Sequence, residues 1–149
     1  MRFVTTLTLL LALTCTACGG GEGPEAEIRA QIAALADAAE AGEIAPFGDA
    51  ISRNYADLRG NDRRQVLLTI RGIMLRSSGK LAVFPDVEQV SLITDDFAEA
   101  RVRTRFAGAD LDRFALETAV YSFVVSFERD GRDWQIVSAR WAPGDGEPR

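Results

Sequence analysis

Two cysteines, Cys15 and Cys18, are the side chains whose type and spacing point most directly to chemistry. They are the only thiols among 149 residues, and the chain contains no histidine. A disulfide, a metal site and a lipid attachment point are the three possible uses of such a pair. Two thiols alone cannot complete a tetrahedral zinc site, so the sequence predicts no metal and no cofactor. The lack of histidine also removes the commonest general base near neutral pH.

The segment before the cysteines has the pattern of an export signal. Met1 and Arg2 are followed by an uncharged apolar run over residues 3–14, which is shorter than the about 20 residues that a membrane-spanning helix needs. The sequence "CTAC" resembles the bacterial lipoprotein motif, with the small residue Ala17 directly before Cys18. Thr14, which precedes Cys15, is bulkier. We therefore predict a lipoprotein signal peptide over residues 1–17 and a lipid on Cys18; a cleaved secretory signal without lipid is the alternative.

The residues after Cys18 extend the same interpretation. The run "GGGEGP" lacks apolar anchors, and its glycines are typical of a flexible tether, which we place at residues 18–24. Cleavage would remove Cys15 and acylation would occupy Cys18, so no disulfide is expected. Gly19 is not the Asp that retains many lipoproteins at the inner membrane, so the resemblance implies the bacterial cell envelope, at the outer membrane facing the periplasm. The expected membrane partner is reached through the lipid.

Charge and length limit the function classes. The chain has 17 basic and 22 acidic residues, a net charge of −5. This balance argues against a nucleic-acid partner and against polybasic attachment to anionic lipid. The portion after the tether has the length of one compact domain, which we place at residues 25–142 and follow with a disordered tail over residues 143–149.

The first half of this domain predicts three helices. Apolar residues at helical spacing between Pro24 and Gly42 indicate a helix over about residues 25–41. Pro46 opens a short second helix whose shared face carries Phe47, Ile51 and Tyr55. Asp62 with Gln65 three residues later is typical of a capping box, and it predicts a third, largely buried helix in "RRQVLLTIRGIMLRS".

From Leu81 onward the apolar period changes from helical to two, which indicates strands joined by the hairpin turn "ERDGRD". Helices followed by antiparallel strands predict an α+β fold, with N-terminal helices packed on a curved sheet. This order, the break "YADLRG" after the second helix and the closing "DGRDWQIVSARW" resemble the nuclear transport factor 2-like, or SnoaL-like, superfamily. The resemblance implies a cone-shaped α+β barrel with a pocket between the helices and the concave sheet face.

Enzymes of this superfamily suggest one catalytic hypothesis. Its isomerases use a carboxylate after the second helix as a base, which in this sequence corresponds to Asp57, with Tyr55 beside it. The isomerases also need a tyrosine in the first helix and a second acid in the pocket, and this chain has neither; its dehydratases use histidine. Asp is also favoured in chain breaks for its local hydrogen bonds. An isomerase or hydrolase that uses Asp57 with Tyr55 is therefore the alternative function.

The strand pattern predicts an apolar pocket whose lining has no group of polar side chains. The alternative is a fully packed core with no void. Its lining would combine the sheet with the helices: Phe106, Tyr121, Phe123, Val125, Tyr55 and Ile70. Trp134 and Trp141, seven residues apart on one strand, are expected on opposite sheet faces.

On the strand that contains Phe106, three arginines alternate with the apolar residues: Arg101, Arg103 and Arg105. They indicate either a solvated outer face or an interface for a homodimer or an acidic partner. The sequence thus predicts a lipid-anchored, non-catalytic domain that binds a small apolar ligand or a protein.

Overall fold

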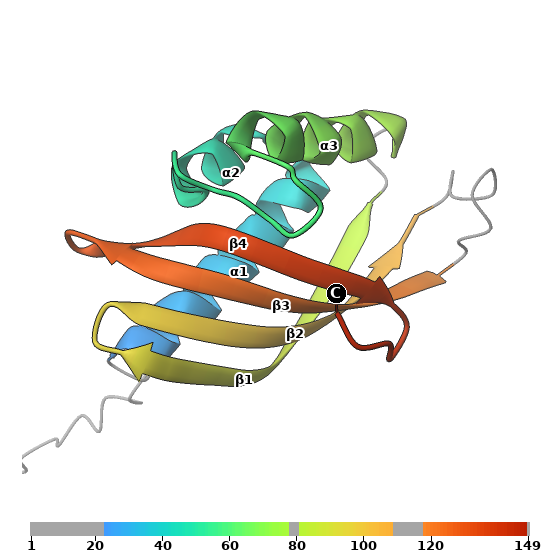
Figure 1. Cartoon of the computed structure of the whole chain (residues 1–149). Helices are drawn as coiled ribbons and strands as arrows, with labels where there is room; N and C mark the ends of the chain where they lie inside the picture. The colour runs from blue at the N-terminus through green and yellow to red at the C-terminus, as the bar shows by residue number, and fades with distance from the viewer. Residues whose placement is uncertain (1–22, 78–80, 109–117, 149) are drawn as a thin grey trace, which may run out of the picture.

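Three helices lie on one side of a four-stranded antiparallel sheet (Figure 1). The computed structural model of the protein describes residues 23–77, 81–108 and 118–148. The helices are α1 (Pro24–Ala41), α2 (Ala45–Ala50) and α3 (Arg63–Arg76), and the strands are β1 (Ala82–Thr94), β2 (Phe97–Ala107), β3 (Thr118–Asp130) and β4 (Asp133–Pro143). The predicted α+β class is confirmed. The predicted signal peptide, Cys18 and most of the tether lie outside the described residues.

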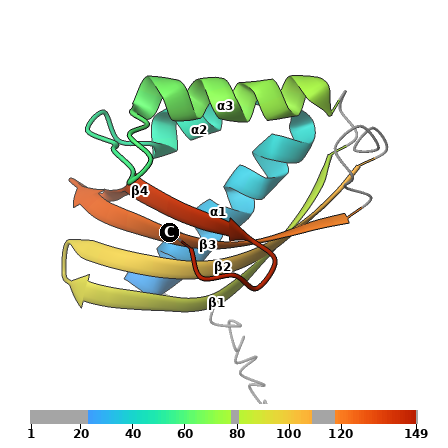
Figure 2. The same cartoon turned by 45° about the vertical axis from the view of Figure 1, so that its right-hand side comes forward.

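The sheet is a simple meander that curves around the helices. Its strand order is β1-β2-β3-β4, and each neighbouring pair is antiparallel. Within the described residues the curved sheet does not close into a barrel (Figure 2). Strand β2 shows which face is covered, because Ala98, Ala100 and Val102 are buried while Arg101 and Arg103, which alternate with them, are exposed.

Helix α1 is the element that covers the concave face. Pro24 stands in its first turn, and Gly42 ends it in the left-handed conformation with φ 72°, as is common for a glycine after a helix. Ile28 is 0% exposed and belongs to the core cluster with Ala98 and Phe127. The predicted first helix is confirmed to within one residue at its start.

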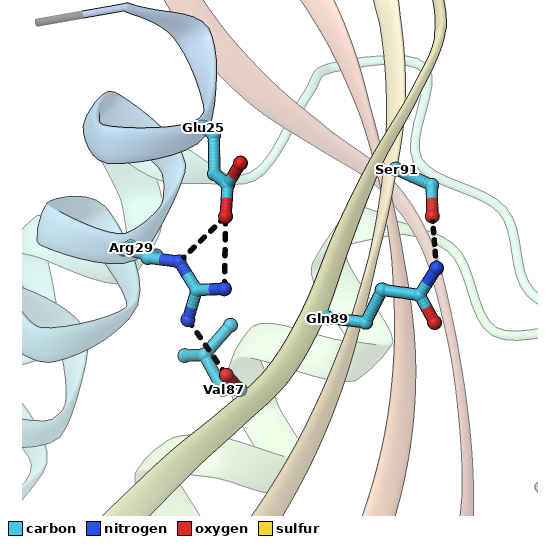
Figure 3. A network of polar contacts seen from close by, with 5 residues as sticks. All are labelled: Glu25, Arg29, Val87, Gln89 and Ser91. Atoms are coloured by element: carbon cyan, nitrogen blue, oxygen red, sulfur yellow. Dashed lines mark hydrogen bonds and ion pairs between the residues drawn. The ribbon is translucent and has the colours of Figure 1, made fainter. Parts of the chain in front are cut away.

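Side chains of α1 also form hydrogen bonds with backbone groups at the β1 edge of the sheet. Figure 3 shows Arg29 between Glu25 and β1, where its Nη1 donates to the Val87 carbonyl oxygen over 2.6 Å and its Nη2 donates to Glu25 Oε1 over 2.9 Å. Farther along the helix, Glu40 Oε1 accepts from the Val83 N–H over 2.7 Å. Pro85 lacks an N–H. This part of the edge therefore offers few groups for pairing with another strand.

The second and third helices differ from expectation. Helix α2 ends at Ala50, and Ile51 is extended with ψ 121° and forms a parallel bridge with Ile136, so Ile51 and Tyr55 do not continue that helix. The capping box of α3 is confirmed, with Asp62 and Gln65 exchanging both hydrogen bonds. The prediction that α3 is largely buried is wrong, because Met74 is its one buried residue.

A bulge in β4 overturns the prediction for the two tryptophans. Ser126 pairs with Ser138 but Phe127 pairs with Ile136, so Val137 is an extra residue in β4. The insertion reverses the alternation between Trp134 and Trp141. Trp134 is buried in the core cluster with Ile28, and Trp141 pairs with Phe123, which packs against that cluster. Both rings therefore lie on the helix-covered face.

The C-terminal residues differ from the predicted disordered tail. Pro143 belongs to β4. Beyond it the Gly144 N–H donates to the Val120 carbonyl over 2.7 Å, and Ser122 Oγ donates to the Gly144 carbonyl over 2.7 Å. These bonds hold the first residues of the segment against β3.

Candidate functional site

The loop between α2 and α3 positions Tyr55 and Asp57, the two residues of the catalytic hypothesis. It is tied to the bulged part of β4, where Ser52 N–H donates to the Ile136 carbonyl over 2.9 Å and Ala56 N–H donates to the Val137 carbonyl over 3.1 Å. Tyr55 is buried, and its hydroxyl donates to Asp57 Oδ2 over 3.3 Å. The structure therefore brings these two side chains together.

The Asp57 carboxylate accepts its hydrogen bonds from residues of its own loop. Its Oδ1 accepts from the backbone N–H groups of Arg59 and Asn61, each over 2.9 Å. Its Oδ2 accepts from Asn61 Nδ2 over 2.9 Å in addition to the Tyr55 hydroxyl. Aspartate commonly organises turns through such bonds to the backbone two residues on. The contacts of Asp57 match this structural role.

The pKa values of the pair argue against acid–base work. Burial acts to raise the pKa of Asp57, but the hydrogen bonds from Asn61, Arg59 and Tyr55 outweigh it and leave that pKa below its ordinary value. Burial, with the adjacent Asp57 charge, raises the pKa of the Tyr55 hydroxyl. A general base works best when its pKa is near the operating pH. Asp57 would be a weak base, and Tyr55 would hold its proton.

The aromatic residues of the predicted pocket gather on the sheet. The rings of Phe106 and Tyr121 meet edge to face with centroids 6.0 Å apart, and Phe123 lies 6.2 Å from Tyr121 and 6.5 Å from Phe106. We call these three residues the aromatic cluster. All three are half-buried, so each ring keeps surface that solvent or a ligand reaches.

The other predicted lining residues have different surroundings. Val125 packs against the core cluster, Tyr55 turns its hydroxyl to Asp57, and Ile70 is half-buried on α3. That these residues line one cavity with the aromatic cluster stays a prediction.

Sequence reasoning missed Trp141 and Arg59 as neighbours of this region. Trp141 pairs with Phe123 across β3 and β4, so its ring shares the face of the aromatic cluster. The Arg59 guanidinium stands over the Trp141 ring at 4.3 Å from its centroid, and Arg59 Nη2 donates to the Trp141 carbonyl over 3.2 Å. The broken alternation in "WQIVSARW" is the feature of the sequence that could have revealed the bulge.

The arginine stripe of Arg101, Arg103 and Arg105 lies exposed on the opposite sheet face. Arg103 forms ion pairs with Glu88 at 3.1 Å and with Asp145 at 3.4 Å. The exposure of the stripe is compatible with both predicted uses, a solvated face or an interface.

Among the described residues no group of three or more Cys, Asp or Glu side chains is placed to hold a metal ion. None of the helices in the described ranges has the length and apolarity to cross a membrane.

Comparison with known proteins identifies the fold. No protein-family model and no curated protein sequence matches the chain. Among solved structures, a nuclear transport factor 2-like protein of unknown function from Shewanella oneidensis aligns with TM-score 0.66 and 12% identity, over 80% of this chain and 98% of that one.

Two other bacterial structures align equally well. A putative calcium/calmodulin-dependent protein kinase II association domain from Xanthomonas campestris has TM-score 0.67 and 16% identity, over 83% of this chain and 90% of that one. An uncharacterised protein with a cystatin-like fold from Caulobacter vibrioides has TM-score 0.67 and 14% identity, over 80% and 88%. At identities this low the alignments support a shared fold and nothing more. The chain therefore has the nuclear transport factor 2-like fold.

Proposed function

We propose that this protein is a lipid-anchored, non-catalytic binding domain of the bacterial cell envelope that holds a small apolar ligand at the aromatic cluster. The observation that carries the proposal is the set of three half-buried rings, Phe106, Tyr121 and Phe123, in mutual contact on the concave sheet face. Ligand sites are commonly lined by aromatic side chains with few polar groups.

The charge of this face supports an apolar ligand. In the ladders that the structure describes, the residues sharing the face of the aromatic cluster are uncharged except Arg129, which pairs with Glu27 of α1 at 2.9 Å. Arg129 also stacks over Trp134, and the Trp134 Nε1–H donates to the same Glu27 oxygen over 3.0 Å. This charge is used to join α1 to the β3–β4 hairpin, so it is a structural pair.

The isomerase or hydrolase alternative has less support. Tyr55 and Asp57 do meet, but the carboxylate accepts three further hydrogen bonds from its own loop. A base must be able to accept a proton, and these donors favour its charged, proton-poor state.

A protein partner on the arginine stripe is the second candidate function. Exposed arginines on one strand present positive charge that is complementary to an acidic surface. The structurally similar Xanthomonas protein is described as an association domain, which makes self-association of this chain worth testing.

Binding of a hydrophobic fluorescent probe tests the main proposal. We expect the folded domain to bind the probe stoichiometrically, and we expect Tyr121→Trp to weaken binding because a larger ring would fill the site. Phe84→Ala is the matched control, since Phe84 pairs with Arg105 on the opposite sheet face and is 52% exposed. Circular dichroism confirms that each variant is folded. Absence of probe binding, or equal binding by Tyr121→Trp, would contradict the proposal.

Metabolic labelling with a fatty-acid analogue tests the anchor. We expect label in the wild type and in Cys15→Ser, and none in Cys18→Ser. Cell fractionation then distinguishes the outer from the inner membrane. Labelling that persists without Cys18 would show the attachment site to be elsewhere.

A further inference from the structure

A groove between α2 and α3 lies apart from the aromatic cluster. It has a volume of about 470 Å³, and its walls come from Ile44 directly before α2, the loop between α2 and α3, and residues 63–71 of α3. The lining residues are Ile44, Arg53, Asp62, Arg63, Arg64, Leu67, Leu68 and Arg71. This volume is within the range of about 300–1,000 Å³ that is usual for small-molecule sites.

The groove concentrates positive charge in an acidic protein. Four of its lining residues are arginines, whereas the whole chain carries a net charge of −5. None of the ion pairs formed within the described ranges involves Arg53, Arg63, Arg64 or Arg71. The one acidic lining residue, Asp62, accepts from the Gln65 N–H over 2.8 Å as the cap of α3. The arginine charges therefore have no carboxylate partner in the described structure.

Arg63 fixes the two walls of the groove relative to each other. Its Nε donates to the Ile51 carbonyl over 3.0 Å, and its Nη2 donates to the Gly48 carbonyl over 2.7 Å. These bonds join the first residue of α3 to α2 and the residue after it. The half-buried Arg63 thus ties α3 to α2, while Arg53, Arg64 and Arg71 line the groove and are exposed.

Apolar residues lie between the charges. Arg64, Leu67, Leu68 and Arg71 have the spacing i, i+3, i+4 and i+7, so they share one face of α3. Leu68 is 58% exposed even though it is a large apolar side chain. An exposed leucine between unpaired arginines suits a ligand that offers an anionic group and an apolar segment together. Arginine recognises phosphate and carboxylate groups well, because its planar fork donates two parallel hydrogen bonds.

We propose that the α2–α3 groove binds an amphiphilic anion, a phosphate or carboxylate head carried on an apolar chain. The head lies among Arg53, Arg64 and Arg71, and the chain lies along Leu67 and Leu68. This site is separate from the aromatic cluster and does not depend on it. Whole-chain charge argued against contact with anionic lipids, but the structure gathers the arginines locally.

Isothermal titration with decyl phosphate, below its micelle concentration, tests this site. Inorganic phosphate supplies the head without the chain, and decyl maltoside supplies the chain without the charge. We expect decyl phosphate to bind tightest. The double variant Arg64→Gln/Arg71→Gln should weaken its binding by about tenfold or more, because charge-assisted hydrogen bonds are lost. Salt should weaken wild-type binding as well.

Arg101→Gln/Arg105→Gln is the matched control, because it removes the same charge from the exposed sheet face. Tyr121→Trp separates this site from the proposed apolar site, and both variants should bind decyl phosphate like the wild type. Four results would overturn the proposal: no binding of decyl phosphate, equal binding of decyl maltoside, equal binding of inorganic phosphate, or unchanged binding by the Arg64/Arg71 variant.

Discussion

Helices α1 and α3 both carry apolar residues at helical spacing, yet the protein uses them in different ways. In α1, Ile28 is fully buried against the sheet, and Glu27, Arg29 and Gln31 make hydrogen bonds to residues of the strands. In α3, Leu68, Ile73 and Leu75 are exposed and Met74 is the one buried residue. Helix α1 completes the core, whereas α3 presents much of its apolar surface to solvent.

The difference shows that the cause of helix formation and the cause of helix burial are separate. Helix α3 is secured locally, by a capping box typically worth about 1 kcal/mol and by the Arg63 bonds to α2. Its burial would need a partner surface, and exposed apolar residues grouped together commonly mark interaction sites. Helix α1 is thus a structural element, whereas the proposed α2–α3 groove makes α3 the binding element.

The largest expected effect of a single substitution is therefore in α1. Ile28→Ala should lower the free energy of unfolding by about 2–5 kcal/mol, because it leaves a cavity among fully buried neighbours. Leu75→Ala is the control in α3, where the side chain is 70% exposed; its effect should stay within about 0.5 kcal/mol. Urea unfolding measures both, and equal losses would mean that α3 is packed as tightly as α1.

A smaller effect is expected in the loop that joins the core to α3. Asp57→Asn replaces one acceptor oxygen by a donor and disrupts hydrogen bonds from Asn61 and Arg59. The free energy of unfolding at pH 7 should therefore fall by about 1–3 kcal/mol. Because the pKa of Asp57 is lowered by folding, its contribution is complete above about pH 4 and is lost as the pH falls through the folded pKa.

The pH dependence gives this prediction a second measurement. Urea unfolding of wild type and Asp57→Asn should show a stability gap at pH 7 that narrows below about pH 4. A gap of constant size down to pH 2 would mean that the Asp57 carboxylate is not stabilised in the folded state.

The outer sheet face should tolerate substitution if it is solvated. Replacing Arg101, Arg103 and Arg105 together by Gln should change stability by about 0–1 kcal/mol, because exposed ion pairs contribute little. Sedimentation at several ionic strengths then tests association. Salt-sensitive assembly that disappears in the triple variant supports an interface, and identical assembly in both proteins removes it.

The smallest effect is expected on the exposed face of α3. Leu68→Ser should leave the free energy of unfolding within about 0.5 kcal/mol of the wild type, yet it should weaken decyl phosphate binding, since Leu68 lines the groove. Urea unfolding and titration of the same preparation separate the two quantities. A large loss of stability would place Leu68 in the core instead.

Local sequence patterns predicted the elements of the fold well. The alternation of Arg101, Arg103 and Arg105 with apolar residues predicted β2 and its two faces, and Asp62 with Gln65 predicted the start of α3. These features depend on neighbours close in the chain, so the sequence contains their cause.

Predictions that depended on distant partners were less successful. The prediction that Trp134 and Trp141 lie on opposite faces was wrong because one inserted residue, Val137, reverses the alternation. The loop that hydrogen-bonds to this bulge lies some 80 residues earlier in the chain. The burial of α3 was wrong because apolar spacing does not show whether another element covers the helix. The α2–α3 groove was missed because Arg53 and Arg71 line the same groove only in the folded chain.

Hydrogen exchange of the full-length protein, with and without decyl phosphate, tests most directly the claim that α1 is structural and α3 is a binding element. Buried, well-packed helices open only with large free energies, whereas elements with few buried contacts open locally. We predict strong protection of α1 amides in both samples, and weaker protection of α3 amides that rises when decyl phosphate is added. Equal protection of both helices without ligand, together with no change in α3 on its addition, would contradict the claim.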